Sequence, residues 1–271
     1  MHANEAREAN RRLWDERVPI HLKSAFYDVD GFVKGTRDGI EPFEAEELGP
    51  VDGLSLAHLQ CHFGIDTLSW ARRGARVVGV DFSAPAIEAA RALARRVGVP
   101  EAEFVLADVY DAVSVLGGRR FDIVYTGKGA LTWLPDLPAW AAVCGRIVAP
   151  GGVLYLSEFH PVGDVFGWGD EFSPTYSYFL EGPMVDESRG TYADVNAQTY
   201  ENVSVEWHHP LGDVVSAIAA AGFRIELVHE YPFTLYPRWA FLEHRDDGTY
   251  WFPAGKAMLP LLYSVRARAP R

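Results

Sequence analysis

The chain has 271 residues, 48% of them hydrophobic and 23% charged, and a formal net charge of −12. This composition is ordinary for a folded domain, and a chain of this length buries enough apolar surface to fold without disulfides. Because a negative surface repels phosphates, the charge argues against nonspecific binding to nucleic acid or to anionic membranes. The two cysteines, Cys61 and Cys144, cannot make a disulfide framework and are typical of a reducing compartment.

The beginning of the chain is charged throughout and lacks the apolar core of a signal peptide. No run approaches the ~18 consecutive apolar residues that a membrane-spanning helix needs. We therefore expect a cytoplasmic protein that does not enter a membrane and that exists as a monomer or a homodimer.

Residues 1–50 form the first of four stretches of different texture, and we expect them to be a helical region. A helix-forming run covers residues 4–17, and Pro19 should limit its extent because proline lacks a backbone donor. Three glycines interrupt the aromatic-bearing stretch that follows. A second short helix is expected at residues 43–48.

Residues 51–157 alternate between short apolar runs and helical patterns. Such alternation is typical of βαβ units, in which a parallel sheet is covered by helices on both faces. Ser83 and Gly98 flank the strongest helical pattern as its expected caps. The expected strands are 54–59, 76–80, 103–106, 121–125 and 153–157, and the expected helices are 66–73, 85–97 and 136–148.

Residues 158–208 break this alternation and are rich in aromatic side chains, proline and glycine. A flexible linker would not carry so much apolar area, so we interpret the segment as an inserted cap, partly of β-structure. Residues 209–271 then return to a regular pattern, with a helix at 211–221 and strands at 223–230 and 258–266. The ten aromatic residues of the cap are Phe159, Phe166, Trp168, Phe172, Tyr176, Tyr178, Phe179, Tyr192, Tyr200 and Trp207.

The first strand, turn, helix and second strand follow the plan of a nucleotide-binding half, which ends in an acidic residue that accepts from ribose hydroxyls. Asp81 is that residue, 17 positions after Gly64. Dinucleotides need the pattern G-x-G-x-x-G, because their pyrophosphate approaches the backbone. Here the turn carries Gln60 and His62, and of the glycines only Gly64 remains. S-adenosylmethionine (SAM) has no phosphate, so its binding turn is more tolerant.

Five segments occur in the order and spacing of one family. The chain resembles the class I SAM-dependent methyltransferases, and in particular a group of small bacterial methyltransferases whose first motif reads HLQCH-x-G-x-DT. It departs from most of the class at His58, where an acidic residue is usual, and at Gln60 and His62, where glycines are usual. The matching segments are HLQCHFGIDT at 58–67, VGVDFS at 78–83, ADV at 107–109, FDIVYTG at 121–127 and APGG at 149–152.

This resemblance implies an α/β, Rossmann-like, doubly wound sheet of seven mostly parallel strands, with the last strand antiparallel and inserted between the fifth and sixth. The SAM-binding core would be residues 51–157, with 1–50 as a lid, 158–208 as the inserted substrate cap and 209–271 as the rest of the sheet. The implied cofactor is S-adenosyl-L-methionine. The residues expected to bind it are Tyr27, Gln60, Cys61, His62, Gly64, Thr67, Asp81, Phe82, Ser83, Asp108, Val109, Thr126 and Gly127.

Some of these residues also have plain structural interpretations. Cys61 is better explained as a small apolar turn residue than as a nucleophile, since a reactive thiol needs a lowered pKa and a partner. Tyr27 is either a lid contact or part of a docking surface, and His62 either contacts the amino-acid end of SAM or packs. Asp108 either accepts from the adenine amino group or caps a turn.

Three residues are candidates for catalysis. Glu158 and His160 follow the fifth strand and His208 ends the cap, so each is placed to face an acceptor. An imidazole titrates near neutrality and can serve as a general base, although His160 before Pro161 could instead be structural. The candidates for contact with the acceptor are Trp14, Lys128, Trp133, Trp168 and Tyr178. No cluster has the spacing of metal ligands, so we expect no metal.

The expected function is methyl transfer from SAM to a nucleophilic atom of a small-molecule acceptor, with no nucleic acid as partner. The aromatic cap favours an acceptor that is partly apolar or aromatic. Three alternatives remain: a SAM enzyme with other chemistry such as cyclisation, a nicotinamide oxidoreductase, and a non-catalytic SAM-binding protein. Product analysis separates the first from a methyltransferase, and binding of NAD or of SAM separates the other two.

Overall fold

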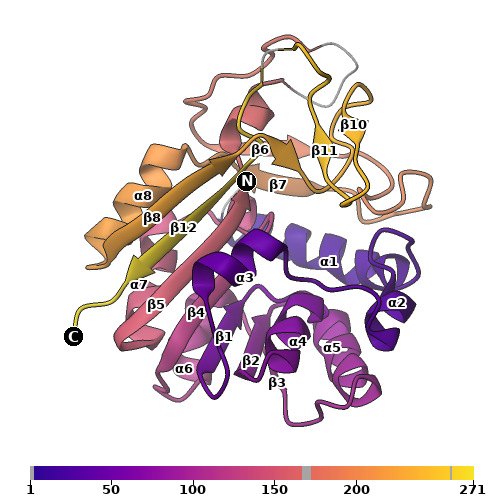
Figure 1. Cartoon of the computed structure of the whole chain (residues 1–271). Coiled ribbons are helices and arrows are strands. Elements are labelled where there is room, and N and C mark those ends of the chain that lie inside the picture. Colours follow the sequence, from indigo (N-terminus) through magenta and orange to yellow (C-terminus); the bar gives the residue numbers. More distant parts are fainter. Residues whose placement is uncertain (1–2, 167–171, 257) are drawn as a thin grey trace.

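A computed structural model of the chain describes residues 3–166, 172–256 and 258–271. At its centre lies a seven-stranded sheet with the order β3-β2-β1-β4-β5-β12-β8 (Figure 1). Only β12 runs antiparallel to its neighbours β5 and β8, which confirms the expected fold class. The strands are β1 Ser55–Leu59, β2 Arg76–Asp81, β3 Glu103–Leu106, β4 Phe121–Gly127, β5 Val148–Phe159, β8 Arg224–Tyr231 and β12 Leu262–Arg268.

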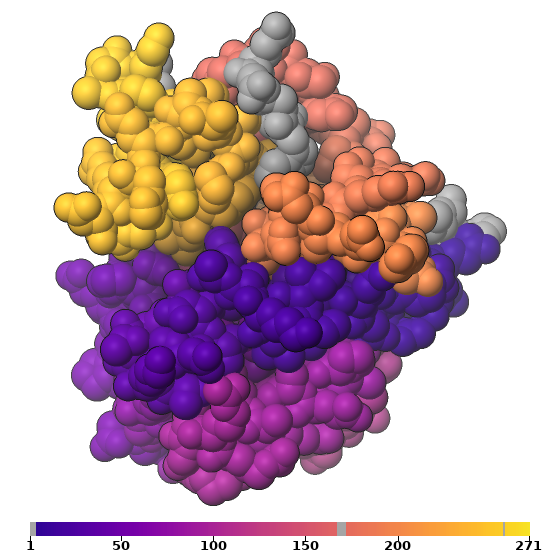
Figure 2. Space-filling view, turned by 90° about the vertical axis from the view of Figure 1, so that its right-hand side faces the viewer, coloured from indigo at the N-terminus to yellow at the C-terminus, as the bar shows by residue number. Residues whose placement is uncertain are grey.

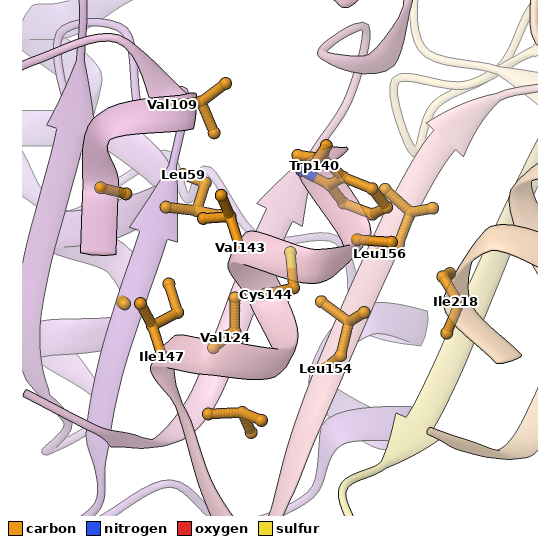
Figure 3. Close-up of a cluster of buried hydrophobic side chains, with 14 of the residues drawn as sticks. Leu59, Val109, Val124, Trp140, Val143, Cys144, Ile147, Leu154, Leu156 and Ile218 are labelled. Carbon is orange, nitrogen blue, oxygen red and sulfur yellow. The ribbon is translucent and has the colours of Figure 1, made fainter. Parts of the chain in front are cut away.

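Helices cover both faces of the sheet. Successive strand residues point to opposite sides, and the apolar residues on each side pack against helices. Leu56 packs with α4 and α5 on one face, whereas Ala57 packs with α7 and α8 on the other. Trp140 and Cys144 of α7 lie against the second face (Figure 3). The α-helices are α1 Ala3–His21, α2 Val29–Lys34, α3 Pro42–Leu48, α4 Ile65–Arg72, α5 Ala84–Arg96, α6 Ala112–Val115, α7 Leu137–Ile147 and α8 Leu211–Ala220.

Capping residues and proline in the sequence account for where two of these helices begin or end. Ser83 caps α5 by accepting from the backbone N–H of Ala86, as expected. Pro19 lies in the last turn of α1, which ends two residues later at His21. Short 3-10 helices occur at Val109–Asp111, Leu131–Trp133 and Pro161–Phe166. Within the described residues, no helix is both long and apolar enough to cross a membrane.

Two small sheets lie beyond the carboxyl ends of the central strands (Figure 1). One pairs β6, Pro183–Asp186, with β7, Ser204–Trp207, inside the segment expected to be the cap. The other joins β9 Phe233–Thr234, β10 Glu243–His244 and β11 Tyr250–Trp251, and nothing in the sequence pattern indicated it. In Figure 2 the N-terminal residues form a band between the core and these upper segments.

Candidate functional site

A cleft opens at the carboxyl ends of β1, β2 and β4, the edge where parallel sheets bind their ligands. It encloses about 1050 Å³ between atoms, part of it open to solvent. Its walls come from α1, from the turn after β1, from the ends of β2 and β4, and from the loop after β3. One cap residue, Tyr192, also lines it.

The turn after β1 has an unusual backbone. Gln60, His62 and Gly64 all have positive φ, at 60°, 49° and 84°. A non-glycine residue in this region costs about 1–2 kcal/mol, and such strain is concentrated at functional sites. Gly64 has a second reason to be glycine, since a Cβ there would lie 2.7 Å from the ring of Phe104. The chain thus keeps the glycine-type backbone of this turn while placing two large side chains on it.

Asp81 ends β2 beside this turn. Its Oδ2 accepts from the backbone N–H of His62 at 2.8 Å, and its Oδ1 accepts from the backbone N–H of Ser83 at 2.9 Å. Burial raises the pKa of Asp81 to about 6, although these N–H groups act in the opposite direction. Each carboxylate oxygen keeps a lone pair, so the group is fixed in place and can still accept from a ligand.

A second carboxylate marks the far end of the cleft. Asp108 Oδ1 accepts from the backbone N–H of Tyr110 at 3.0 Å, and Oδ2 lies 3.3 Å from Nη1 of Arg7 on α1. The residue therefore caps a turn, which is one of its two sequence interpretations, and it also lines the cleft.

The other end of the cleft holds a buried charge cluster. Lys128 Nζ lies 2.8 Å from Glu44 Oε2 and 3.5 Å from Asp66 Oδ2. Burial lowers the pKa of Lys128, but the neighbouring carboxylates outweigh it and raise the pKa overall. Gln60 Nε2 donates to the carbonyl of Ala130 at 2.8 Å, whereas its buried Oε1 has no partner in the described part of the chain. This oxygen is therefore available to accept from a ligand.

The electrostatics of the cleft favour a cation. Among the described residues that line it, Arg7 and Lys128 are the only basic side chains apart from histidines, and both are ion-paired. Burial lowers the pKa of His58 to about 3, so its imidazole stays neutral. The carboxylates of the lining therefore leave an excess of negative charge, and the described residues of the cleft include no free cation that could hold a pyrophosphate.

Most residues expected to bind a cofactor line this cleft, and so do three expected at the acceptor, Trp14, Lys128 and Trp133. Trp168 lies outside the described residues. Arg7 and Asn10 also line the cleft and were not predicted, although their spacing with Trp14 puts all three on one face of α1. The expected cofactor residues in the cleft are Tyr27, Gln60, Cys61, His62, Gly64, Asp81, Phe82, Asp108, Val109 and Gly127.

Three expected cofactor residues lie behind the cleft instead. Thr67 Oγ1 is 2.8 Å from His58 Nδ1 inside the core. Ser83 is used as a helix cap and donates to Asp15 Oδ1 at 2.7 Å. Thr126 is fully buried on β4, one position before Gly127, which does line the cleft. Alternation along the strand turns its side chain away.

Glu158 is buried and bound to the main chain. Its Oε2 accepts from the N–H groups of Ala130 and Leu131 at 2.8 and 3.0 Å, and Oε1 accepts from Gly129 and Phe159. The carboxylate therefore holds the loop after β4 rather than facing the cleft, which corrects its expected place at the acceptor.

The two histidines expected in catalysis are also engaged away from the cleft. His160 Nε2 lies 2.9 Å from Glu230 Oε1, and its Nδ1 accepts from the N–H of Val162 at 3.1 Å. His208 Nδ1 lies 3.3 Å from Asp164 Oδ2. Neither ring lines the cleft, because His160 pairs with Glu230 near the end of β8 and His208 pairs with Asp164.

Tyr178, expected at the acceptor, instead accepts from the N–H of Leu211 at 3.1 Å and so caps α8. Burial raises the pKa of the Cys61 thiol, which makes it a poor nucleophile. Within the described residues, no three side chains of His, Cys, Asp or Glu are grouped to hold a metal ion.

Residues 57–152 match a family model described as a methyltransferase domain. The chain is 30% identical over 156 residues to a ubiquinone biosynthesis O-methyltransferase of Paracidovorax citrulli, covering 56% of this chain and 59% of the relative. A protein with the same name from Methylobacterium sp. (strain 4-46) is 28% identical over 213 residues, covering 72% of this chain and 83% of the relative. The chain spans about half to three-fifths of the first three relatives it matches.

Solved structures show the same fold. A SAM-dependent methyltransferase from Mesorhizobium loti superposes with a TM-score of 0.61 at 25% identity, covering 89% of this chain and 99% of that one. A Burkholderia thailandensis N1-methyltransferase, solved with 1,6-didemethyltoxoflavin and S-adenosylhomocysteine, has a TM-score of 0.56 at 15% identity, covering 100% and 92%. Residues 57–152 are therefore a methyltransferase domain, in a chain that has the Rossmann-like fold of the class I methyltransferases.

Proposed function

We propose that the chain is a SAM-dependent methyltransferase that acts on a small-molecule acceptor. The observation that carries this proposal is the carboxylate of Asp81, fixed by two backbone N–H groups at the end of β2 in a cleft whose described residues include no free cation. A carboxylate in this position accepts from a ribose diol, and the lack of a phosphate-binding group argues against a dinucleotide.

The unpartnered Oε1 of Gln60 is the observation against which the fit of SAM can be judged. The amino-acid end of SAM carries an ammonium group, and Gln60 with Asp66 supplies the acceptors that such a group needs. At the opposite end, Asp108 and Val109 would hold the adenine edge. The net negative lining suits a ligand that carries a sulfonium and an ammonium.

SAM, when bound, supplies a methyl group that its sulfonium has already activated. The main task of the protein is then to hold donor and acceptor in line at roughly 3–3.5 Å. The side chains of α1 and the aromatic residues Trp14, Tyr27 and Trp133 close the cleft and exclude water from it. This lining favours an acceptor with a flat, apolar part.

The relatives suggest an oxygen nucleophile, because their names describe O-methyltransferases. The net charge of −12 supports a small molecule rather than a nucleic acid as acceptor. A cytoplasmic location and a monomeric or homodimeric state stay predictions from composition.

Calorimetry with S-adenosylhomocysteine and with NAD tests the proposal. We expect S-adenosylhomocysteine to bind at one site per chain and NAD to bind weakly or not at all. Binding of NAD alone would contradict the proposal and favour an oxidoreductase. Mass analysis of products from SAM then separates methyl transfer, which yields S-adenosylhomocysteine, from cyclisation, which does not.

A further inference from the structure

Two histidines form a pair beside the cleft to which no role has been assigned above, although His62 by itself is among the residues expected to bind the cofactor. His62 Nε2 lies 3.1 Å from Nδ1 of His21, the last residue of α1. His21 is fully buried, whereas His62 lines the cleft. The second ring nitrogen of His62, Nδ1, has no hydrogen-bond partner among the described residues. The pair thus leaves one ring nitrogen of His62 available to a ligand.

The position of His62 in the cleft is defined by its own backbone. Its N–H holds the carboxylate of Asp81, and Gln60 with its unpartnered Oε1 lies two residues before it. His62 therefore lies between Asp81, at the end of the cleft that suits a ribose, and Gln60, at the end that suits an amino acid. A reacting atom attached to a sulfur between these two ends would lie near this imidazole.

Aromatic rings surround His62 on the side of the lid. Trp14 and Tyr27 lie 5.2 and 5.8 Å from it between ring centroids. The hydroxyl of Tyr27 is hydrogen-bonded to that of Tyr192, which comes from the cap and is 41% exposed. These rings form a mouth, defined here as Trp14, Tyr27 and Tyr192, through which a flat ligand would reach the imidazole.

We propose that the acceptor is an uncharged hydroxyl on an aromatic ring, that His62 accepts its proton, and that His21 positions His62. This inference rests on the methyl transfer proposed above. In this step a lone pair of the hydroxyl oxygen forms the new bond to the methyl carbon. The carbon–sulfur bond breaks and its electron pair stays on sulfur. The hydroxyl proton passes to Nδ1 of His62, so one positive charge moves from sulfur to the imidazole.

The hydrogen bond to His21 prepares His62 for this role. The proposal requires the tautomer in which His62 Nε2–H donates to His21 Nδ1, because only this tautomer leaves a lone pair on Nδ1 of His62. The same bond strengthens when His62 becomes an imidazolium. His21 therefore acts through His62 and does not itself touch the acceptor.

Both imidazoles of the pair are neutral before the reaction. Burial, together with Arg17 nearby, lowers the pKa of His21 to about 3, and burial and His21 lower the pKa of His62. Besides Arg17, the titratable groups near the pair are Tyr27, Tyr192 and the Asp81 carboxylate, which binds the His62 main chain.

A neutral imidazole suits a hydroxyl better than an amine. An aromatic hydroxyl keeps an oxygen lone pair while it still carries its proton, so it can react while His62 takes the proton. An aliphatic amine is protonated at neutral pH, and a buried imidazole of low basicity would not remove that proton beforehand.

The test uses His62→Asn, because asparagine tolerates the left-handed backbone of this residue and lacks the basic nitrogen. His62→Gly is a second variant that also fits this backbone, and His244→Asn, on exposed β10, is the control. Calorimetry first measures the affinity of wild type and variants for S-adenosylhomocysteine. Initial rates with SAM are then measured with phenol, catechol and 4-hydroxybenzoate, and with benzylamine as the amine probe.

We expect the wild type to methylate an aromatic hydroxyl in this panel and His62→Asn to lower kcat by roughly 10²–10⁴-fold. The affinity for S-adenosylhomocysteine and the melting temperature should change little. The deficit of the variant should shrink as the pH approaches about 10, where the hydroxyl ionises and needs no base.

Two results with the variants would overturn the inference: an unchanged kcat in His62→Asn, or a loss of S-adenosylhomocysteine binding that parallels the loss of activity in both His62 variants. Two results with the wild type would also overturn it. One is methylation of benzylamine instead of a hydroxyl, and the other is binding of S-adenosylhomocysteine without methylation of any of the phenols. Failure of the wild type to bind S-adenosylhomocysteine would instead overturn the proposed function on which it rests.

His21→Phe tests the positioning role. It keeps a ring against Trp14 and removes the acceptor for His62 Nε2–H. We expect kcat to fall about tenfold or more at an unchanged KM. The ¹⁵N chemical shifts of the His62 ring should change from those of a single tautomer to those of a mixture of tautomers. A purely structural role of His21 would not cause this change. Unchanged ¹⁵N shifts would contradict it.

Discussion

Single residues in the cleft are arranged before any ligand binds. Asp81 is held by two backbone N–H groups and Gln60 by the carbonyl of Ala130, so neither side chain must be ordered on binding. Such preorganisation lowers the entropic cost of association. The strained backbone at Gln60 and His62 belongs to the same arrangement, since it places two side chains on a turn whose backbone conformation favours glycine.

Asp81→Asn should weaken binding of S-adenosylhomocysteine by about 100-fold or more, because hydrogen bonds from two hydroxyls to a carboxylate contribute roughly 1.5–3 kcal/mol each. Calorimetry at neutral pH measures the change. Asp111→Asn, an exposed aspartate near the same edge of the sheet, is the matched control and should bind like wild type. Equal affinities for the two variants would show that Asp81 does not contact the ligand.

The pKa of about 6 of Asp81 also predicts a pH dependence. Donors from a ribose stabilise the ionised carboxylate, so the pKa falls on binding. Affinity for S-adenosylhomocysteine should therefore be constant above about pH 7 and decline as the pH falls through 6, where the free carboxyl binds a proton. Calorimetric titrations between pH 5 and pH 8 check this (roughly the range in which only histidines and this group titrate). Affinity that rises with acidity would contradict the assignment.

Glu158→Gln separates a structural from a catalytic role for that residue. An amide has one accepting oxygen, so two of the four backbone N–H groups that Glu158 binds would lose their acceptor. We expect the free energy of unfolding to fall by about 2–5 kcal/mol. Denaturant titration measures it. A catalytic base would instead lower kcat while leaving stability unchanged.

At the scale of elements, α1 joins the core to the cap. Asp15 accepts from Ser83 at the start of α5, and Arg7 pairs with Asp108. On its other side, buried Asn10 donates to the carbonyl of Val205 on β7 and accepts from its N–H. The N-terminal residues, of which α1 is part, form a band between these parts (Figure 2), so a ligand under the helix would be retained by contacts on both sides.

Asn10→Ala should release this helix from the cap. The two backbone groups of Val205 lose a buried partner, which costs about 2–4 kcal/mol. Dissociation of S-adenosylhomocysteine, followed by stopped-flow fluorescence, should become at least tenfold faster. Arg12→Ala is the control, because Arg12 also bridges α1 to the cap, through Glu201, but its ion pair is exposed and contributes little. The same rate in both variants would exclude a lid role.

The sequence predicts the central sheet because each of its strands carries its own apolar pattern and each helix its own caps, as Ser83 illustrates. It also predicts Asp81, since the position at a strand end depends only on local order. It cannot show that Glu158 binds a loop or that His21 meets His62, because these contacts depend on which way a side chain turns and on residues 41 positions apart. The same reason hides the small sheet at 233–251, whose strands are only two residues long.

At the scale of the whole molecule, the net charge of −12 agrees with the acidic lining of the cleft. A ligand with a net positive charge is attracted over a distance set by the ionic strength, about 30 Å at 0.01 M salt and about 8 Å at 0.15 M. SAM carries one net positive charge, whereas S-adenosylhomocysteine has lost the sulfonium and is neutral overall. Salt therefore screens an attraction between net charges that SAM has and that S-adenosylhomocysteine lacks.

Raising the salt concentration should therefore weaken SAM binding more than S-adenosylhomocysteine binding. Between 0.01 M and 0.15 M salt we expect the dissociation constant of SAM to rise several-fold and that of S-adenosylhomocysteine to change little, because only the first interaction is between net charges. Competition calorimetry over this range measures both constants on one preparation. Parallel salt dependences would show that the sulfonium charge does not contribute to the affinity of the cleft for SAM. The release of S-adenosylhomocysteine after methyl transfer would then need a cause other than the loss of that charge.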